Sequence, residues 1–149
     1  MRQTAQSCLN QHLADKLKSP TVVPAGDWFT SAERHHKSAQ LIINHDPAGA
    51  LQMAWSAMHD IAKGAAAASG LRLDGETHGK IADFLACTYA DELDDRERGL
   101  IRTVHGHRNK SSYDDPRVSQ GPMIGAAVNL AGKMIQIAIA NLAPPRTTA

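Results

Sequence analysis

The stretch that decides the fold is Pro47–Ser69, which reads PAGALQMAWSAMHDIAKGAAAAS. Its apolar residues recur every three or four positions, which is the spacing of one face of an α-helix. Asp46 is a suitable N-cap before a proline in the first turn, and Gly70 is a typical residue just beyond a helix C-terminus. The run of alanines before Ser69 favours close packing against a neighbouring element. We therefore expect a long helix whose inward-facing residues are Leu51, Ala54, Trp55, Met58, Ile61, Ala62 and Ala65.

The same period extends in both directions along the chain, and the alternation of a half-buried strand is absent, so the pattern predicts an all-α protein. Asp27 is a plausible N-cap for the preceding helix, and LRLDGE after Gly70 is expected to be a loop. The expected architecture is a compact antiparallel bundle of five or six helices in a single domain, residues 1–149. Its expected parts are an N-terminal helix and connector (1–26), a core bundle (27–142) and a frayed tail (143–149), with helices at about 3–17, 27–45, 47–69, from 77, from 91–97, and 121–142.

Composition points to an ordinary soluble domain. The net charge of +1 argues against a broad basic surface for nucleic acid, although a local phosphate site remains compatible with it. Cys8 and Cys87 both lie on apolar stripes and are expected to be buried free thiols. The absence of a CxxC or Cys/His cluster predicts no structural zinc, and no cofactor is expected. With no signal-like N-terminus and no apolar stretch of about 18 residues, we expect a reduced, cytoplasmic protein without a membrane span.

The chemistry is concentrated in residues 102–116, RTVHGHRNKSSYDDP. Guanidinium groups suited to holding a phosphate lie beside groups that exchange protons near neutral pH. No other segment combines the two. The residues concerned are Arg102, His105, His107, Arg108, Asn109 and Tyr113.

On a helical wheel of about 100° per residue, we take Leu93, Leu100 and Val104 as the apolar centre. His107 and Arg108 then flank this stripe, while Arg102, His105 and Asn109 lie on the far side. An inward Arg108 needs an anionic partner, which could be a scissile phosphate, Asp114 or Asp115. A basic helix C-terminus is also favourable by itself, because it complements the helix macrodipole.

This layout resembles a HEPN domain, a small helical bundle whose late helix carries an Arg, a polar residue, and then a His or Tyr a few positions on. The resemblance covers about Asp27 to Leu142. It rests on the long Ala-rich helix ending in Gly70-Leu71, the His78 helix, the Arg108-Asn109-x-x-x-Tyr113 motif and the final apolar helix. Two departures stand out. Tyr113 occupies the position where catalytic members have His, and Arg102-x-x-x-x-His107 has the nuclease spacing with Thr103 as the neighbour of the Arg.

The resemblance implies a homodimer acting on RNA as a metal-independent endoribonuclease of a toxin–antitoxin, defence or stress system. Arg102 and Arg108 would hold the phosphate, His107 would be the acid or base, and Asn109 would orient the substrate. Tyr113 would contact substrate, or be adenylylated by a nucleotidyltransferase-type antitoxin. The alternative is a non-catalytic HEPN module that binds nucleotide, RNA or a partner protein as a dimerising scaffold. A third reading is an unrelated helical bundle serving as a partner subunit.

The remaining histidines carry weaker signals. His35, His36 and His45 are expected to be exposed or at the edge of the core. His59 and Asp60 lie in the middle of the long helix, where they could form a buried polar pair or the wall of a cleft.

Overall fold

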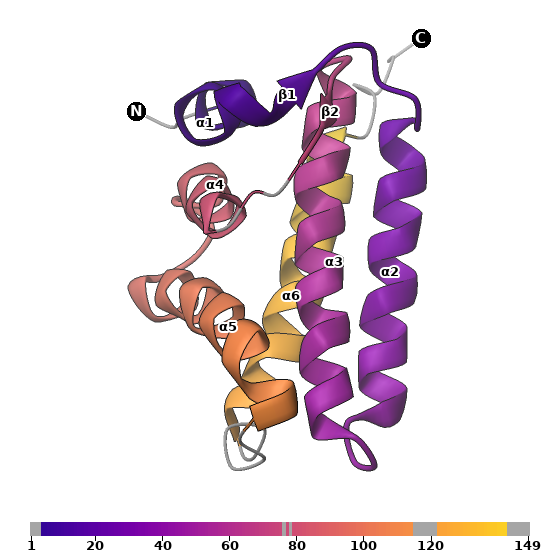
Figure 1. The fold of residues 1–149 in the computed structure, drawn as a ribbon, viewed down its shortest axis with the longest axis vertical. Coiled ribbons are helices and arrows are strands. Elements are labelled where there is room, and N and C mark those ends of the chain that lie inside the picture. The colour runs from indigo at the N-terminus through magenta and orange to yellow at the C-terminus, as the bar shows by residue number, and fades with distance from the viewer. Residues whose placement is uncertain (1–3, 76, 78, 115–121, 143–149) are drawn as a thin grey trace, which may run out of the picture.

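The computed structural model describes residues 4–75, 77, 79–114 and 122–142, with the side chains of 107–114, 122 and 142 excluded. The described residues form an all-α bundle with one very short strand pair, which confirms the expected fold class (Figure 1). The elements are α1 (Ala5–Leu13), the 3₁₀ turn η1 (Ala14–Lys16), β1 (Leu17–Lys18), α2 (Ala25–Ile42), α3 (Pro47–Ala68), β2 (Arg72–Leu73), α4 (Lys80–Thr88), α5 (Asp95–Asp114) and α6 (Pro122–Leu142).

Helix α3 begins and ends as its sequence predicts. The Asp46 carboxylate accepts a hydrogen bond from the backbone N–H of Gly49 at 2.9 Å, and Pro47 occupies the first turn. At the other end Gly70 has a φ of 77°, a left-handed conformation that glycine adopts without steric cost. The expected inward residues of α3 are buried, apart from Ala65, which is partly buried. Helix α3 is therefore the centre of the core.

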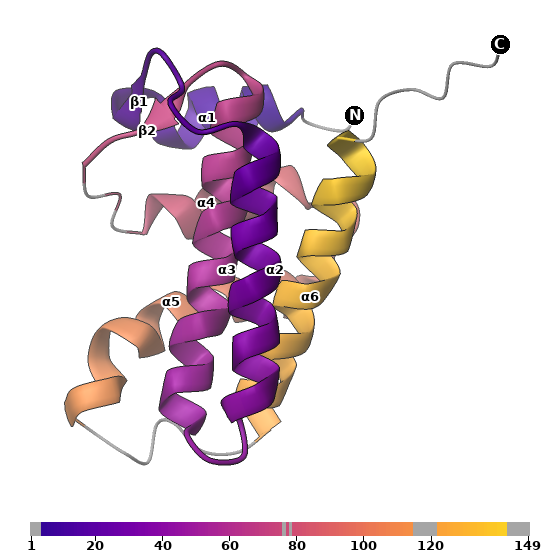
Figure 2. The ribbon, with the colours of Figure 1, turned by 90° about the vertical axis from the view of Figure 1, so that its right-hand side faces the viewer.

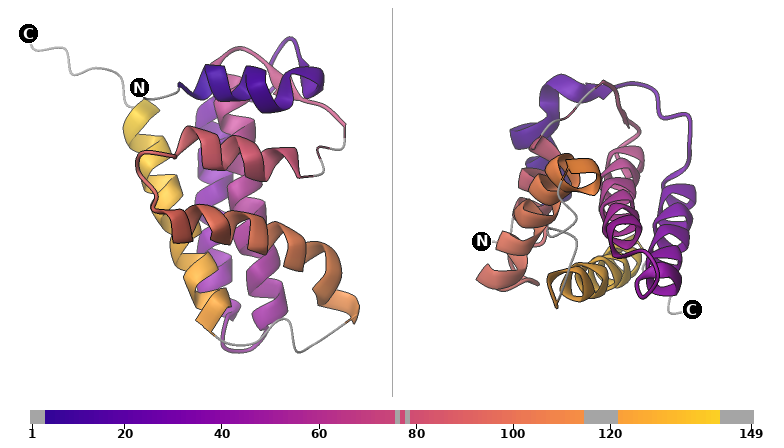
Figure 3. Two further views of the ribbon diagram at one scale, coloured as in Figure 1. Left: turned by 90° about the vertical axis from the view of Figure 1, so that its left-hand side faces the viewer. Right: turned by 60° about the horizontal axis from the view of Figure 1, so that its bottom comes forward.

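The helices form two groups around α3. Helices α2 and α3 run antiparallel, and α6 lies along them (Figure 2). Helices α1, α4 and α5 are stacked one below another and cross the long helices on the opposite side (Figure 3). Since α3 contacts every other α-helix, the two groups share a single hydrophobic core.

Two glycines allow the long helices to approach closely. A Cβ atom added at Gly64 of α3 would lie 2.6 Å from the Phe29 ring of α2. A Cβ atom at Gly132 of α6 would lie 2.7 Å from the His36 ring of α2. Real Cβ atoms do not approach other atoms this closely, so a side chain at either position would force the facing ring to shift.

Several element boundaries differ from the prediction. The first helix ends at Leu13 instead of about Leu17, and Leu17 pairs antiparallel with Leu73 in a segment expected to be a loop. Helix α2 begins before Asp27, whose backbone N–H donates to the carbonyl of Pro24 at 3.0 Å, so Asp27 lies in the first turn and is not the N-cap. Helix α5, for which only a start at about 91–97 was predicted, runs from Asp95 to Asp114.

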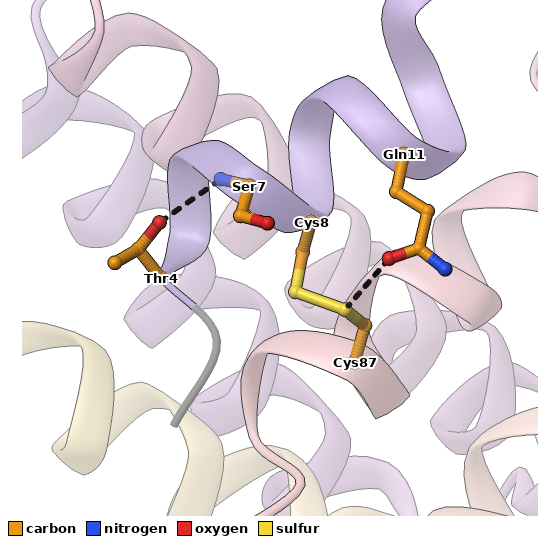
Figure 4. Close-up of a disulfide and its surroundings, with 5 residues drawn as sticks. All are labelled: Thr4, Ser7, Cys8, Gln11 and Cys87. Atoms are coloured by element: carbon orange, nitrogen blue, oxygen red, sulfur yellow. Dashed lines mark hydrogen bonds between the residues drawn. A yellow bond between two sulfur atoms is a disulfide. The ribbon is translucent and has the colours of Figure 1, made fainter. Parts of the chain in front are cut away.

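The two cysteines form a disulfide between α1 and α4, so the prediction of free thiols is wrong (Figure 4). Their Cα atoms lie 5.9 Å apart, a separation that a disulfide spans without backbone movement. Gln11 Oε1 lies 3.9 Å from the Cys87 sulfur, and Thr4 caps α1 by accepting from the backbone N–H of Ser7 at 3.0 Å. Cys8 and Cys87 are 79 positions apart and meet because α1 docks against α4. The periodicity of the sequence does not reveal that docking.

One apolar stretch is longer than expected. Met123–Asn141 in α6 is long and apolar enough, by length and composition, to cross a membrane. However, 44% of its most apolar window is buried inside the structure, where α6 packs on α2 and α3. Helix α6 is thus partly buried in the core of the bundle.

Candidate functional site

Helix α5, which carries the predicted site, is fixed at its start by a reciprocal cap. The Asp94 carboxylate accepts from the backbone N–H of Glu97 at 2.7 Å, and the Glu97 carboxylate accepts from the backbone N–H of Asp94 at 3.1 Å. Lys133 of α6 donates to both Glu97 carboxylate oxygens, at 3.0 and 2.9 Å. Hydrogen bonding to Lys133, and then to the backbone at Asp94, lowers the pKa of Glu97. The cap thus anchors the first turn of α5 to α6.

Among the residues expected to bind or cleave RNA, Arg102 is the one whose side chain the structure describes. It is 67% exposed and forms an ion pair with Asp83 of α4, with Nη2 and Oδ1 3.1 Å apart. Its guanidinium lies at a hollow of about 440 Å³ between α1, α4 and α5. An exposed pair of this kind contributes roughly 0–1 kcal/mol, so an incoming phosphate could displace Asp83.

A second arginine at the same hollow has a structural role. Arg98 donates through Nη1 to the backbone carbonyls of Ala90 and Leu93, and through Nη2 to the Asp95 carboxylate. These contacts hold the turn between α4 and α5. Arg98 is therefore committed to positioning α5.

The predicted wheel is wrong for His105. This residue was expected on the far side of the helix, but its ring packs against Trp55 of α3, with centroids 5.0 Å apart and planes tilted by 50°. Leu93 precedes α5 and does not belong to its wheel, whereas Ile101 and Val104 are both fully buried. Moving the apolar centre toward these two residues turns His105 toward α3.

The side chains of His107, Arg108, Asn109 and Tyr113 lie outside the described part of the structure, whereas the backbone of α5 runs through all four positions. On a regular helix, positions 109 and 113 share a face with Arg102. Positions 107 and 108 lie about 140° and 120° around the axis from Arg102. Helical register alone therefore does not bring both arginines and His107 into one pocket.

A second polar cluster lies between α2 and α3 and includes Asp60, which the sequence suggested as part of a buried polar pair or of the wall of a cleft. Asp60 of α3 is only 4% exposed, and its Oδ2 accepts from Ser31 Oγ at 2.7 Å and pairs with His35 Nδ1 at 2.7 Å. His35 on α2 is therefore a partner of Asp60, one that the sequence did not indicate. A signal was present in the sequence, because His35 lies at helical spacing between Ala32 and Ala39, which are both buried.

This cluster opens onto a hollow of about 280 Å³. Lys63 lies at its edge, with Nζ 4.6 Å from the centre of the Trp28 ring. The wall is formed by His35, Trp55, Ser56, His59, Asp60 and Lys63. Within the described residues, no group of three or more His, Cys, Asp or Glu side chains is placed to hold a metal ion.

Comparisons of the chain with protein-family models, with curated proteins and with solved structures give no match.

Proposed function

We propose that this protein is a HEPN-like RNA-binding protein in which α5 faces the phosphate backbone, and that it cleaves RNA without a metal ion as a homodimer. One observation carries the proposal: α5 is an unbroken helix of 20 residues from Asp95 to Asp114. Its register groups Arg102, Asn109 and Tyr113 on one face. The proposal thus assigns phosphate binding to a single rigid element.

In this mechanism the Arg102 and Arg108 guanidinium groups hold the scissile phosphate and stabilise its developing charge. His107 accepts the proton of the ribose 2′-hydroxyl as that oxygen attacks phosphorus. The bond to the 5′-oxygen breaks, and this leaving oxygen takes a proton from water. Positions 102 and 107 lie on different sides of α5, so one helix does not present Arg102 and His107 to the same phosphate. The proposed site therefore combines residues from the α5 helices of two subunits. Asn109 orients the substrate.

A non-catalytic module is the second candidate, and two observations favour it. Tyr113 stands where catalytic HEPN proteins have His, and Arg102 is paired with Asp83 in the protein alone. Such a module would bind RNA or nucleotide on the same face of α5 without cutting it. A nucleotidyltransferase-type antitoxin that adenylylated Tyr113 would place negative charge near Arg102 and exclude RNA.

A cytoplasmic location is part of the proposal, since cellular RNA would be the substrate. Cytosolic thiols are usually kept reduced, whereas the Cys8–Cys87 disulfide is typical of oxidising compartments. The redox state of these two cysteines in cells would therefore report directly on location.

The test combines cleavage and binding of a fluorescent single-stranded RNA by wild type, Arg102→Ala and Arg108→Ala. Arg72→Ala is the matched control, because Arg72 is also exposed and paired with a carboxylate, Asp74, but lies on β2. We expect wild type and the control to cleave RNA, and both α5 variants to lose cleavage while keeping their helical circular dichroism. Binding without cleavage in wild type, lost in the α5 variants, would support the non-catalytic module. Wild-type behaviour of an Arg102→Ala/Arg108→Ala double variant would refute both.

A further inference from the structure

The contact with Asp60 engages one ring nitrogen of His35. His35 Nδ1 lies 2.7 Å from Asp60 Oδ2. Nε2 is the ring nitrogen that this contact leaves for a ligand. Ser31 donates its hydroxyl to the same Asp60 oxygen, so it helps to fix the carboxylate.

The surroundings of the His35–Asp60 pair point to a role beyond joining α2 to α3. Burying a carboxylate costs several kcal/mol, and apolar residues join two helices at least as well. Here the buried carboxylate holds an imidazole that is itself 35% exposed, at the wall of a hollow. Holding an exposed ring in one orientation is useful where the ring contacts a ligand.

The opposite wall consists of hydrogen-bond donors from α3. Ser56 and His59 precede Asp60 and Lys63 follows it, at the helical spacing that places all four on one face. Lys63 also lies over the Trp28 ring, which holds its ammonium at the rim of the hollow. Among the described residues of the wall the only carboxylate is Asp60, and one of its oxygens is already bonded to His35 and Ser31.

These donors suit one class of ligand. Planar carboxylates are best bound by the fork of an arginine, and the wall contains none. Several single donors around a lysine suit a tetrahedral oxyanion, for which lysine acts as a point charge. A hollow of about 280 Å³ lies at the small end of ligand cavities, so it fits a small molecule better than a nucleic-acid strand.

We propose that the hollow between α2 and α3 binds a small phosphate-bearing molecule, with Lys63 and the Nε2 side of His35 contacting the phosphoryl group. Asp60 and Ser31 are positioning residues that orient His35. This site is separate from the RNA surface proposed on α5, and its variants leave the α5 residues intact. Failure of either proposal can therefore be told from failure of the other.

The test is titration of the full chain with inorganic phosphate and, separately, with 5′-AMP, followed by calorimetry and by nitrogen chemical shifts of ¹⁵N-labelled histidine. We expect saturable binding, with the His35 ring nitrogens shifting on addition of either probe. Lys63→Met keeps the aliphatic stem over Trp28 and should weaken binding about tenfold, the size of a lost charge-assisted hydrogen bond. His35→Gln should weaken it comparably.

Lys37→Met and His45→Gln are the matched controls, because both residues are exposed and lie outside the hollow. They should bind as wild type does. Should His35→Gln fail to fold, Lys63→Met still decides the outcome, because Lys63 lies at the rim. Absence of phosphate and 5′-AMP binding at millimolar concentration, equal binding by Lys63→Met, or equal competition by acetate would overturn the proposal. Saturation by an RNA oligonucleotide but by neither small probe would also overturn it.

Discussion

Reduction of the Cys8–Cys87 disulfide should remove a large part of the stability of this protein. The bond joins positions 79 residues apart in sequence. In the chain-entropy treatment, closing a loop of that length in the unfolded chain is worth about 4.5 kcal/mol at 25 °C. Domains of this kind are stable by about 5–15 kcal/mol, so the reduced protein should retain its fold with a much smaller margin. Leu9 and Leu13 of α1 stay buried against the core and keep α1 docked.

The assay is urea unfolding followed by circular dichroism, with oxidised and reduced protein side by side. With a slope of about 2 kcal/mol per molar urea, the midpoint should fall by about 2 M on reduction. A Cys8→Ala/Cys87→Ala variant should resemble the reduced protein and should not respond to reductant. The reasoning is refuted if oxidised and reduced protein unfold at the same urea concentration. Titration of two free thiols in native protein kept from reductant would show that the bond itself is absent.

Two further predictions concern packing and pH. Gly64→Ala should destabilise the protein by about 1–3 kcal/mol in thermal or urea unfolding, because its Cβ would lie 2.6 Å from the Phe29 ring. Gly99→Ala is the control: Gly99 is exposed on α5, with no atom within 4 Å of the added Cβ, so this change should stabilise the protein by about 0.5–1 kcal/mol. Equal effects of the two substitutions would contradict the packing argument. The contacts with Lys133 and the Asp94 backbone lower the folded-state pKa of Glu97 below its ordinary value of 4.5. Their contribution to folding stability is therefore complete above about pH 5 and is lost as pH falls through the folded pKa. Glu97→Gln should be less stable than wild type at pH 7, with the difference shrinking toward pH 3, and a constant difference would argue against this cause.

The candidate site was only partly predictable. The sequence singled out the segment after Arg102 because its chemistry is visible in residue types alone. The ion pair of Arg102 with Asp83 and the contact of His105 with Trp55 were not predicted, because both join α5 to other helices. A wheel centred on Leu93 missed the second contact, since the start of α5 is set by the Asp94 cap. The contact between Asp60 and His35 was not predicted either, because it joins two helices through residues that are 25 positions apart.

By itself the sequence determined the helices, and most firmly α3. Apolar spacing, the Asp46 cap and Gly70 act within a few residues of the chain, so local rules suffice to place that helix. Tertiary structure alone decided that Cys8 meets Cys87, that Leu17 pairs with Leu73, and that a buried Asp60 orients His35 at the edge of a hollow. Each of these contacts forms because the burial of apolar faces fixes how whole helices dock, and no short stretch of sequence contains that information.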